Sequence, residues 1–196
     1  YLGNRSSGKM GNAIAAAAAR RGAAVTLVTA GAGLEHPRVT VVHVETANEM
    51  AEATWAAAEG ADVAVMAAAV ADFRPAETLD GKLRRREGPP VIDLEATPDV
   101  LGGVAAMADR PFLVGFAAEV GGLDEAVAKA RRKGVDLLVA NDVAAPGSGF
   151  GTDTNQVTIV LPDGATEPWS LMSKSEVAER LWDRIAELRK REGPAT

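Results

Sequence analysis

The chain has 196 residues, of which 47% are hydrophobic and 24% are charged, and its formal net charge is −6. This composition excludes a disordered chain and predicts one globular domain over residues 1–196. The negative charge argues against a nucleic-acid partner, and the absence of cysteine excludes disulfides, thiolate catalysis and cysteine-ligated zinc. No apolar run reaches the length of a membrane span and no signal peptide is visible, so we expect a cytoplasmic protein without a membrane partner.

The stretch from Gly3 to Gly11 combines glycines, serines and basic residues ahead of an alanine-rich helical pattern. A helix start binds anions readily, because its amides point outward at the positive end of the helix dipole. The spacing approaches that of a phosphate-binding P-loop, but Met10 stands where Mg²⁺ would need a serine or threonine. Alternatively, Ser6 or Ser7 caps the helix and the glycines allow close packing.

Up to Ala67 the chain alternates between helical and strand patterns. Thr46 and Glu49 have the spacing of a capping box at the start of the second helix. Such alternation predicts an α/β, Rossmann-like three-layer fold with a mostly parallel sheet. The expected elements are a helix over 8–21 ended by Gly22, strands over 23–30, 39–44 and 62–67, and a helix over 47–58.

The regular alternation breaks after Ala67. Residues 68–75 are expected to form an irregular loop of small side chains at the carboxyl end of a strand, where open α/β sheets bind ligands. Residues 82–96 predict a two-stranded arm that covers a site or meets a second subunit, or else a plain surface hairpin. Thr97 is expected to be the N-cap of the next helix, with Pro98 and Asp99 in its first turn.

The remaining chain continues the α/β pattern. A strand over 112–115 leads into a loop at 116–119, and a helix over 124–133 places Lys129 and Lys133 on one face. A strand over 135–140 ends at Asn141-Asp142, and a hairpin follows over 156–169. A capping box from Ser173 to Glu176 opens the final amphipathic helix.

Four loops are expected to meet at one edge of this sheet: residues 4–9, 68–74, 116–119 and 141–142. A site rich in amides, Asn, Lys and Arg, without His or Cys, suits phosphoryl or nucleotidyl transfer, in which positioning and charge stabilisation dominate. A nucleoside triphosphate with Mg²⁺ is the expected ligand, and Asp72 is the candidate metal contact.

Two other functions stay open at this point. An NAD(P)-dependent Rossmann oxidoreductase is possible on such a sheet, but the first turn lacks the G-x-G-x-x-G spacing. The short-chain reductase pair of a tyrosine four residues before a lysine is also missing, since the single tyrosine is Tyr1. A non-catalytic nucleotide-binding domain would use the same amides without a catalytic residue such as Asn4 or Lys82.

Taken together, five segments resemble the phosphopantothenate–cysteine ligase family, the synthetase half of the bacterial bifunctional coenzyme A biosynthesis protein. The segments are Asn-Arg-Ser-Ser-Gly-Lys-Met-Gly at 4–11, Ala-Ala-Val-Ala-Asp-Phe-Arg at 68–74, Thr-Pro-Asp at 97–99, Val-Gly-Phe-Ala-Ala-Glu at 114–119 and Ala-Asn-Asp at 140–142. The resemblance implies that 4′-phosphopantothenate attacks CTP to give an acyl-cytidylate, from which L-cysteine then displaces CMP. Activating the carboxylate in this way divides one difficult condensation into two easier steps.

The resemblance also implies roles for individual residues. Asn4 matches the catalytic asparagine, Ala69 approaches the substrate through its backbone, and Lys82 lies in an arm that closes over the site. Mg²⁺ or Mn²⁺ would be met by Asp72. The positions expected to bind the nucleotide are Ser7, Gly8, Ala68, Asp72, Phe73, Lys82, Asp99, Phe116, Lys129 and Lys133.

The family implies a homodimer and, in the full-length protein, fusion to a flavin-dependent phosphopantothenoylcysteine decarboxylase domain. No flavin is expected in this domain. Relative to the family pattern, a first strand and its glycine-rich loop are missing ahead of Tyr1. His36 and His43 are expected to be structural.

Overall fold

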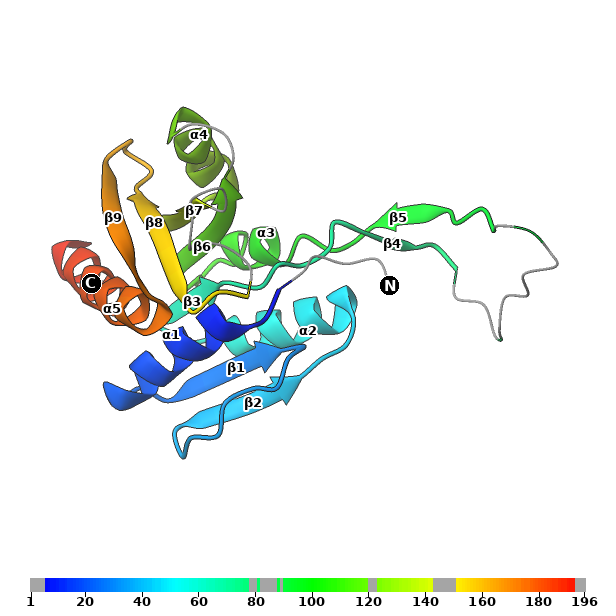
Figure 1. The fold of residues 1–196 in the computed structure, drawn as a ribbon, viewed down its shortest axis with the longest axis horizontal. Coiled ribbons are helices and arrows are strands. Elements are labelled where there is room, and N and C mark those ends of the chain that lie inside the picture. Colours follow the sequence, from blue (N-terminus) through cyan, green and yellow to red (C-terminus); the bar gives the residue numbers. More distant parts are fainter. Residues whose placement is uncertain are drawn as a thin grey trace.

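The structure is a computed structural model, and it describes residues 6–77, 81, 88, 90–119, 123–142 and 151–192. A five-stranded sheet runs through its centre in the order β3-β6-β7-β8-β9 (Figure 1). The first three strands are parallel, and β8 and β9 are antiparallel to their neighbours. The strands are β3 (Val63–Met66), β6 (Phe112–Glu119), β7 (Leu137–Asp142), β8 (Thr154–Val160) and β9 (Thr166–Ser173).

Two pairs of strands stand apart from this sheet. The parallel pair β1 (Val25–Thr29) and β2 (Val39–His43) packs against the helices Lys9–Arg20 and Ala47–Ala58. The antiparallel pair β4 (Phe73–Pro75) and β5 (Leu94–Ala96) belongs to an arm that extends far from the rest of the molecule (Figure 1).

Helices cover both faces of the central sheet, which gives the expected three layers. They are α1 (Lys9–Arg20), α2 (Ala47–Ala58), α3 (Val100–Ala105), α4 (Leu123–Lys133) and α5 (Lys174–Glu192). Within the described ranges, each helix is too short or too polar to serve as a membrane span.

The core divides into two clusters because successive strand residues point to opposite faces of the sheet. Along β6, Phe112 and Val114 pack with α1 and α5, whereas Leu113 packs with α3 and α4. The same alternation occurs in β7, where Leu137 and its neighbour face opposite clusters. The α/β, Rossmann-like fold class is therefore confirmed.

Local signals place several element ends where the sequence predicts them. Thr46 caps α2, and its hydroxyl and the Glu49 carboxylate form the reciprocal capping box. Gly22 adopts a φ of 92° just after α1, as the end of that helix requires. The Ser173 and Glu176 side chains form the capping box at the start of α5.

Several predicted boundaries are wrong. The arm pairs through β4 from Phe73 onward, so part of the expected irregular loop at 68–75 is a strand. Strand β6 continues through the expected loop at 116–119, because β7 pairs with it along that whole length. Asp99, and not Thr97, is the N-cap of α3.

Candidate functional site

The first turn of α1 carries a backbone arrangement suited to an anion. Gly8 occupies the N-cap with φ 69°, a left-handed conformation that glycine adopts without strain. Ser6 and Ser7 lie before it and are exposed, so the alternative in which a serine caps α1 is wrong. Because glycine has no side chain, the cap residue leaves the first-turn amides available to a ligand.

The lysine of this stretch is paired within the protein. Lys9 Nζ lies 2.6 Å from Asp153 Oδ1 and 3.2 Å from the carbonyl oxygen of Gly151. The hydrogen bond from Lys9 lowers the pKa of the exposed Asp153 carboxyl. A P-loop lysine binds phosphate with its ammonium group, so this pairing argues against a P-loop.

A buried lysine binds the same short segment, residues 151–153, that Lys9 contacts. Lys174 is 8% exposed, and its ammonium donates to the carbonyl oxygen of Thr152 at 2.5 Å. Its pKa is lowered, first by burial and then by the charge of Lys9. Sequence reasoning missed this role, because Lys174 has the position of an ordinary first-turn residue of α5.

The loop after β3 and the start of α1 lie at the same edge of the central sheet. The loop follows the carboxyl end of β3, and Lys9 contacts Asp153 just before β8, which is antiparallel to β7 and begins near the carboxyl end of β7. In this loop Ala68 is exposed and Ala69 is half-buried, so a ligand can approach their backbone closely. Asp72 is exposed at the end of the loop, where β4 begins.

Thr97 holds this loop in place. Its hydroxyl donates to the carbonyl oxygen of Ala71 at 2.5 Å, and its amide donates to that of Asp72 at 3.0 Å. Sequence reasoning missed this role, because a Thr-Pro-Asp stretch is typical of a helix start and the threonine is the usual cap.

The start of α3 and the end of α4 meet through an ion pair. Asp99 Oδ1 accepts from the amide of Gly102 at 3.0 Å, and Asp99 Oδ2 lies 2.6 Å from Lys133 Nζ. The hydrogen bond from Lys133 lowers the pKa of Asp99, and the amide of Gly102 lowers it further. The structure thus brings two of the expected nucleotide-binding residues into direct contact with each other.

For three of the other expected nucleotide-binding residues, the structure gives a position and an exposure. Phe116 lies inside β6 opposite Val139, with a half-buried side chain against the core between α1 and α5. Lys129 lies half-buried on α4, four residues before Lys133. Phe73 is 54% exposed on β4 of the arm. Asn4 and Lys82 lie outside the described residues.

The carboxylate at this site suits a magnesium ion that takes most of its ligands from phosphate. Among the residues that the structure describes, no three His, Cys, Asp or Glu side chains group as a metal site. Mg²⁺ in nucleotide enzymes needs only one or two carboxylates, because substrate phosphates and water supply its other ligands. The single exposed carboxylate of Asp72 is compatible with that arrangement.

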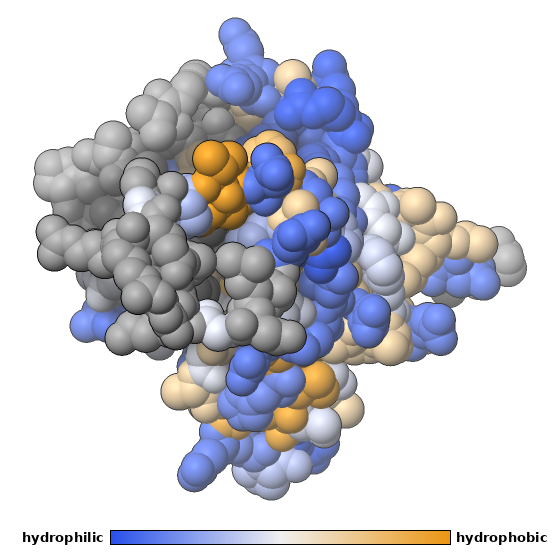
Figure 2. All heavy atoms as spheres, turned by 90° about the vertical axis from the view of Figure 1, so that its right-hand side faces the viewer, coloured by the Kyte–Doolittle hydropathy of each residue, from blue (hydrophilic) through white to orange (hydrophobic). Residues whose placement is uncertain are grey.

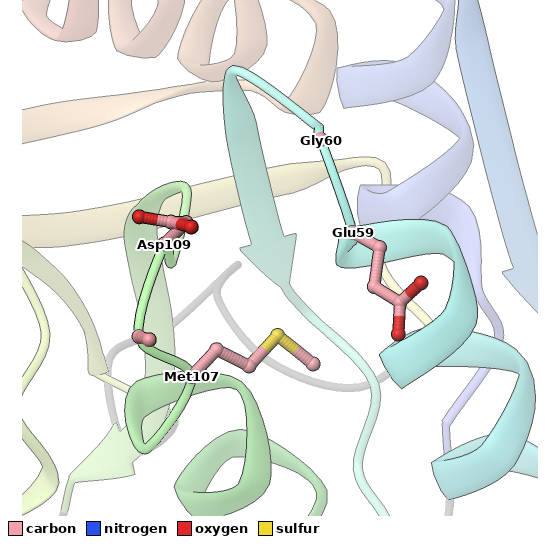
Figure 3. Close-up of a pocket in the computed structure, with 5 residues that line it drawn as sticks. Glu59, Gly60, Met107 and Asp109 are labelled. Carbon is pink, nitrogen blue, oxygen red and sulfur yellow. The ribbon is translucent and has the colours of Figure 1, made fainter.

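A separate hollow lies at the other end of the sheet. It has a volume of about 340 Å³ and is lined by residues that follow α2 and α3, namely Glu59, Gly60, Met107, Ala108 and Asp109. Figure 3 shows Gly60 leading into the start of β3, whereas the loops described above follow the ends of the parallel strands. The hollow is therefore distinct from the candidate site.

The comparisons with known proteins agree with this architecture. A family model described as "DNA/pantothenate metabolism flavoprotein C-terminal domain" matches residues 1–188. The chain is 46% identical to the "Coenzyme A biosynthesis bifunctional protein CoaBC" of Mycobacterium bovis, covering 94% of this chain and 47% of that protein. The protein of the same name from Bacillus subtilis is 38% identical, with 98% and 48% covered.

A solved structure also matches closely. The crystal structure of the C-terminal domain of a coenzyme A biosynthesis bifunctional protein CoaBC has a TM-score of 0.77 and 36% sequence identity, covering 95% of this chain and 85% of that one. The chain spans about half the length of the curated relatives it matches.

Proposed function

Because this chain belongs to the family described as the DNA/pantothenate metabolism flavoprotein C-terminal domain, we propose that it is a phosphopantothenate–cysteine ligase that uses CTP. Three segments at the carboxyl edge of the sheet carry this proposal. Thr97 forms hydrogen bonds with the loop after β3 and leads to the Asp99–Lys133 pair. Lys9, in the first turn of α1, contacts Asp153 just before β8. The relatives' role in coenzyme A biosynthesis supports the choice of substrate.

The proposed reaction has two steps. A carboxylate oxygen of 4′-phosphopantothenate attacks the α-phosphorus of CTP, and pyrophosphate leaves. The amine of L-cysteine then attacks the acyl carbon, and CMP leaves with the oxygen that the carboxylate had contributed. The attacking neutral amine loses one proton, and its nitrogen keeps the other as the N–H of the amide. These steps need bound and oriented reactants more than a strong base, which suits a site without histidine or cysteine.

The amides at the start of α1 would hold a negatively charged group of the substrates. Gly8 leaves these amides open, and the helix dipole adds a positive potential to them. Asn4 would hold the acyl-cytidylate through its carboxamide, and the backbone of Ala69 would approach the same substrate. Ser7 would donate its exposed hydroxyl to the bound phosphate.

Lysines would hold the triphosphate. Lys133 is fixed by Asp99, so its ammonium is positioned before the nucleotide binds. Lys129 lies four residues earlier on α4, and side chains four apart share one helix face. Lys82 would add a third charge from the arm, and Mg²⁺ bound near Asp72 would neutralise phosphate charge.

We propose CTP over ATP on the strength of the family resemblance of the five sequence segments, with the base read by backbone groups near Ala68 and Phe116. The half-buried ring of Phe116 packs on the core, so the Phe116 backbone is the part offered to the base. We also infer that the full-length protein joins this domain to a flavin-dependent decarboxylase domain, because the relatives are bifunctional and about twice as long.

A second copy of the chain is the proposed partner. The arm exposes apolar side chains that water-facing strands usually avoid, with Val91 at 91% and Phe73 at 54% exposed. Ile92 and Leu94 add to this apolar surface, and all four lie on the β4–β5 arm. Figure 2, which faces the side that bears the arm, shows apolar patches next to hydrophilic side chains.

Pyrophosphate release tests the function. The full-length protein is mixed with 4′-phosphopantothenate, Mg²⁺ and either CTP or ATP, with and without cysteine. We expect CTP-selective release, and an Asn4→Asp variant that accumulates no amide product. Release that needs no 4′-phosphopantothenate, or no release with either nucleotide, would contradict the proposal.

A further inference from the structure

The side chains of the loop after β3 cannot form hydrogen bonds that would fix its conformation. From Ala67 to Ala71 its side chains are four alanines and Val70, none of which can donate or accept a hydrogen bond. Its carbonyl oxygens nevertheless need partners when ligands and neighbouring segments exclude water. The loop is therefore positioned through hydrogen bonds of its backbone.

Thr97 supplies donors for such hydrogen bonds from a segment 26 residues away in the chain. Its hydroxyl donates to the Ala71 oxygen at 2.5 Å, and its amide donates to the Asp72 oxygen at 3.0 Å. Two hydrogen bonds to consecutive carbonyl groups fix both the position and the direction of the loop. The hydroxyl is free to do this because Asp99, and not Thr97, caps α3.

The segment that carries Thr97 is itself anchored. Two residues later, Asp99 joins the amide of Gly102 and the ammonium of Lys133. The carbonyl oxygen of Val100 accepts from Trp55 Nε1 at 3.0 Å, which ties the start of α3 to α2. Residues 97–99 therefore connect the loop after β3 to the lysine at the end of α4.

We propose that Thr97 is a positioning residue that sets the distance between the loop after β3 and Lys133. This inference rests on the proposed function, because the loop and Lys133 are taken to bind the same nucleotide. The hydroxyl and the amide of Thr97 both donate to the loop, so no contact with the reacting atoms or the triphosphate is assigned to Thr97. It acts through the backbone of Ala71 and Asp72, so its loss should change nucleotide binding and leave the rest of the fold in place.

The test compares Thr97→Val with Thr97→Ser in the full-length protein. Valine keeps the shape and removes the donor, whereas serine keeps the donor and removes a methyl group. For Thr97→Val we expect KM for CTP to rise about fivefold, the factor given by one lost hydrogen bond of about 1 kcal/mol. KM for cysteine should stay within about twofold, and Thr97→Ser should restore KM for CTP to within about twofold of wild type.

Thr46→Val is the matched control. Its hydroxyl accepts from the Glu49 amide at 3.1 Å at the start of α2, so this variant also loses one threonine hydrogen bond. We expect it to lower the melting temperature and to leave KM for CTP unchanged. A purely structural role for Thr97 would instead make the two valine variants behave alike.

The outcomes separate this inference from the proposed function. Pyrophosphate release by the wild type, with an unchanged KM for CTP in Thr97→Val, would overturn the role of Thr97 and keep the ligase. A rise in KM that serine does not reverse would also overturn it, because packing and not the hydrogen bond would be responsible. A wild type that neither binds CTP nor releases pyrophosphate would overturn both.

Discussion

A methyl group at Gly103 would collide with the indole ring of Trp55. The Cβ atom of an alanine there would lie well inside van der Waals contact with Trp55 Nε1 and Cε2. Non-bonded atoms in proteins do not approach this closely. The Trp55 ring packs against α3, so it cannot change rotamer as easily as the end of a flexible side chain. The ring must move, and the 3.0 Å hydrogen bond from its Nε1 to the Val100 oxygen would break.

The cost of Gly103→Ala follows from three contributions. Overpacking costs about 1–3 kcal/mol, and the lost hydrogen bond costs about 1 kcal/mol. Alanine is favoured over glycine inside a helix by about 1 kcal/mol, which offsets the second contribution. The net loss is about 1–3 kcal/mol, or roughly 3–10 °C in melting temperature for a domain of this size.

Thermal unfolding measured by circular dichroism tests this estimate. Gly11→Ala is the control, because a Cβ atom at that position in α1 meets no atom within 4 Å. We expect Gly11→Ala to be as stable as the wild type or slightly more stable. If the Gly103→Ala and Gly11→Ala proteins had the same melting temperature, the packing of α3 against Trp55 would be refuted.

Three further predictions concern charge, assembly and packing. The pKa of Asp99 is lowered, so its contribution to stability is present above about pH 4 and is lost as the pH falls through the lowered folded-state pKa. The melting temperature of Asp99→Asn should therefore be lower than that of the wild type at neutral pH and equal to it in strong acid. A difference in melting temperature that stays constant across this range would contradict the ion pair. Val91→Asp should convert a dimer to a monomer in sedimentation experiments, because it places a charge on the exposed apolar arm; an unchanged mass would exclude the arm as the contact. Trp182→Phe should cost about 1 kcal/mol in urea unfolding, because the indole donates to the Ile14 oxygen at 3.0 Å; equal stability would argue against this contact between α1 and α5.

Local chemistry made the helices predictable. The predicted range 47–58 coincides with α2, because Thr46 and Glu49 satisfy the free amides at its start. Gly22 follows the end of α1 because its positive φ is strained for residues that have a side chain and unstrained for glycine. Such signals lie within a few residues of the boundary they set, so one sequence is enough to read them.

Tertiary partners decided the boundaries that the sequence missed. Strand β6 looks complete at Gly115, since the following Phe-Ala-Ala-Glu stretch is short and low in β-branched residues. Pairing with β7 up to Asp142 extends the strand, and that partner lies beyond α4 in the chain. The pairing of Phe73 with Ala96 is equally remote from local signals.

The edge of the sheet that bears the candidate site was predictable, and its contacts were not. The expected segments lie at the carboxyl ends of the parallel strands, although residues 116–119 and 141–142 belong to β6 and β7 and not to loops. The Asp99–Lys133 pair joins residues 34 apart, and the Lys9–Asp153 pair joins residues 144 apart. Either lysine could have faced solvent on its helix, and only the packing of α3, α4 and β8 decides which carboxylate it meets.

An oxygen-labelling experiment tests the proposed reaction most directly. The carboxylate of 4′-phosphopantothenate is labelled with ¹⁸O, and the products formed with CTP, Mg²⁺ and cysteine are weighed by mass spectrometry. Attack of the carboxylate on the α-phosphorus predicts one labelled oxygen in CMP and none in pyrophosphate. Label in inorganic phosphate, with CDP in place of CMP, would mean activation at the γ-phosphorus and would contradict the acyl-cytidylate.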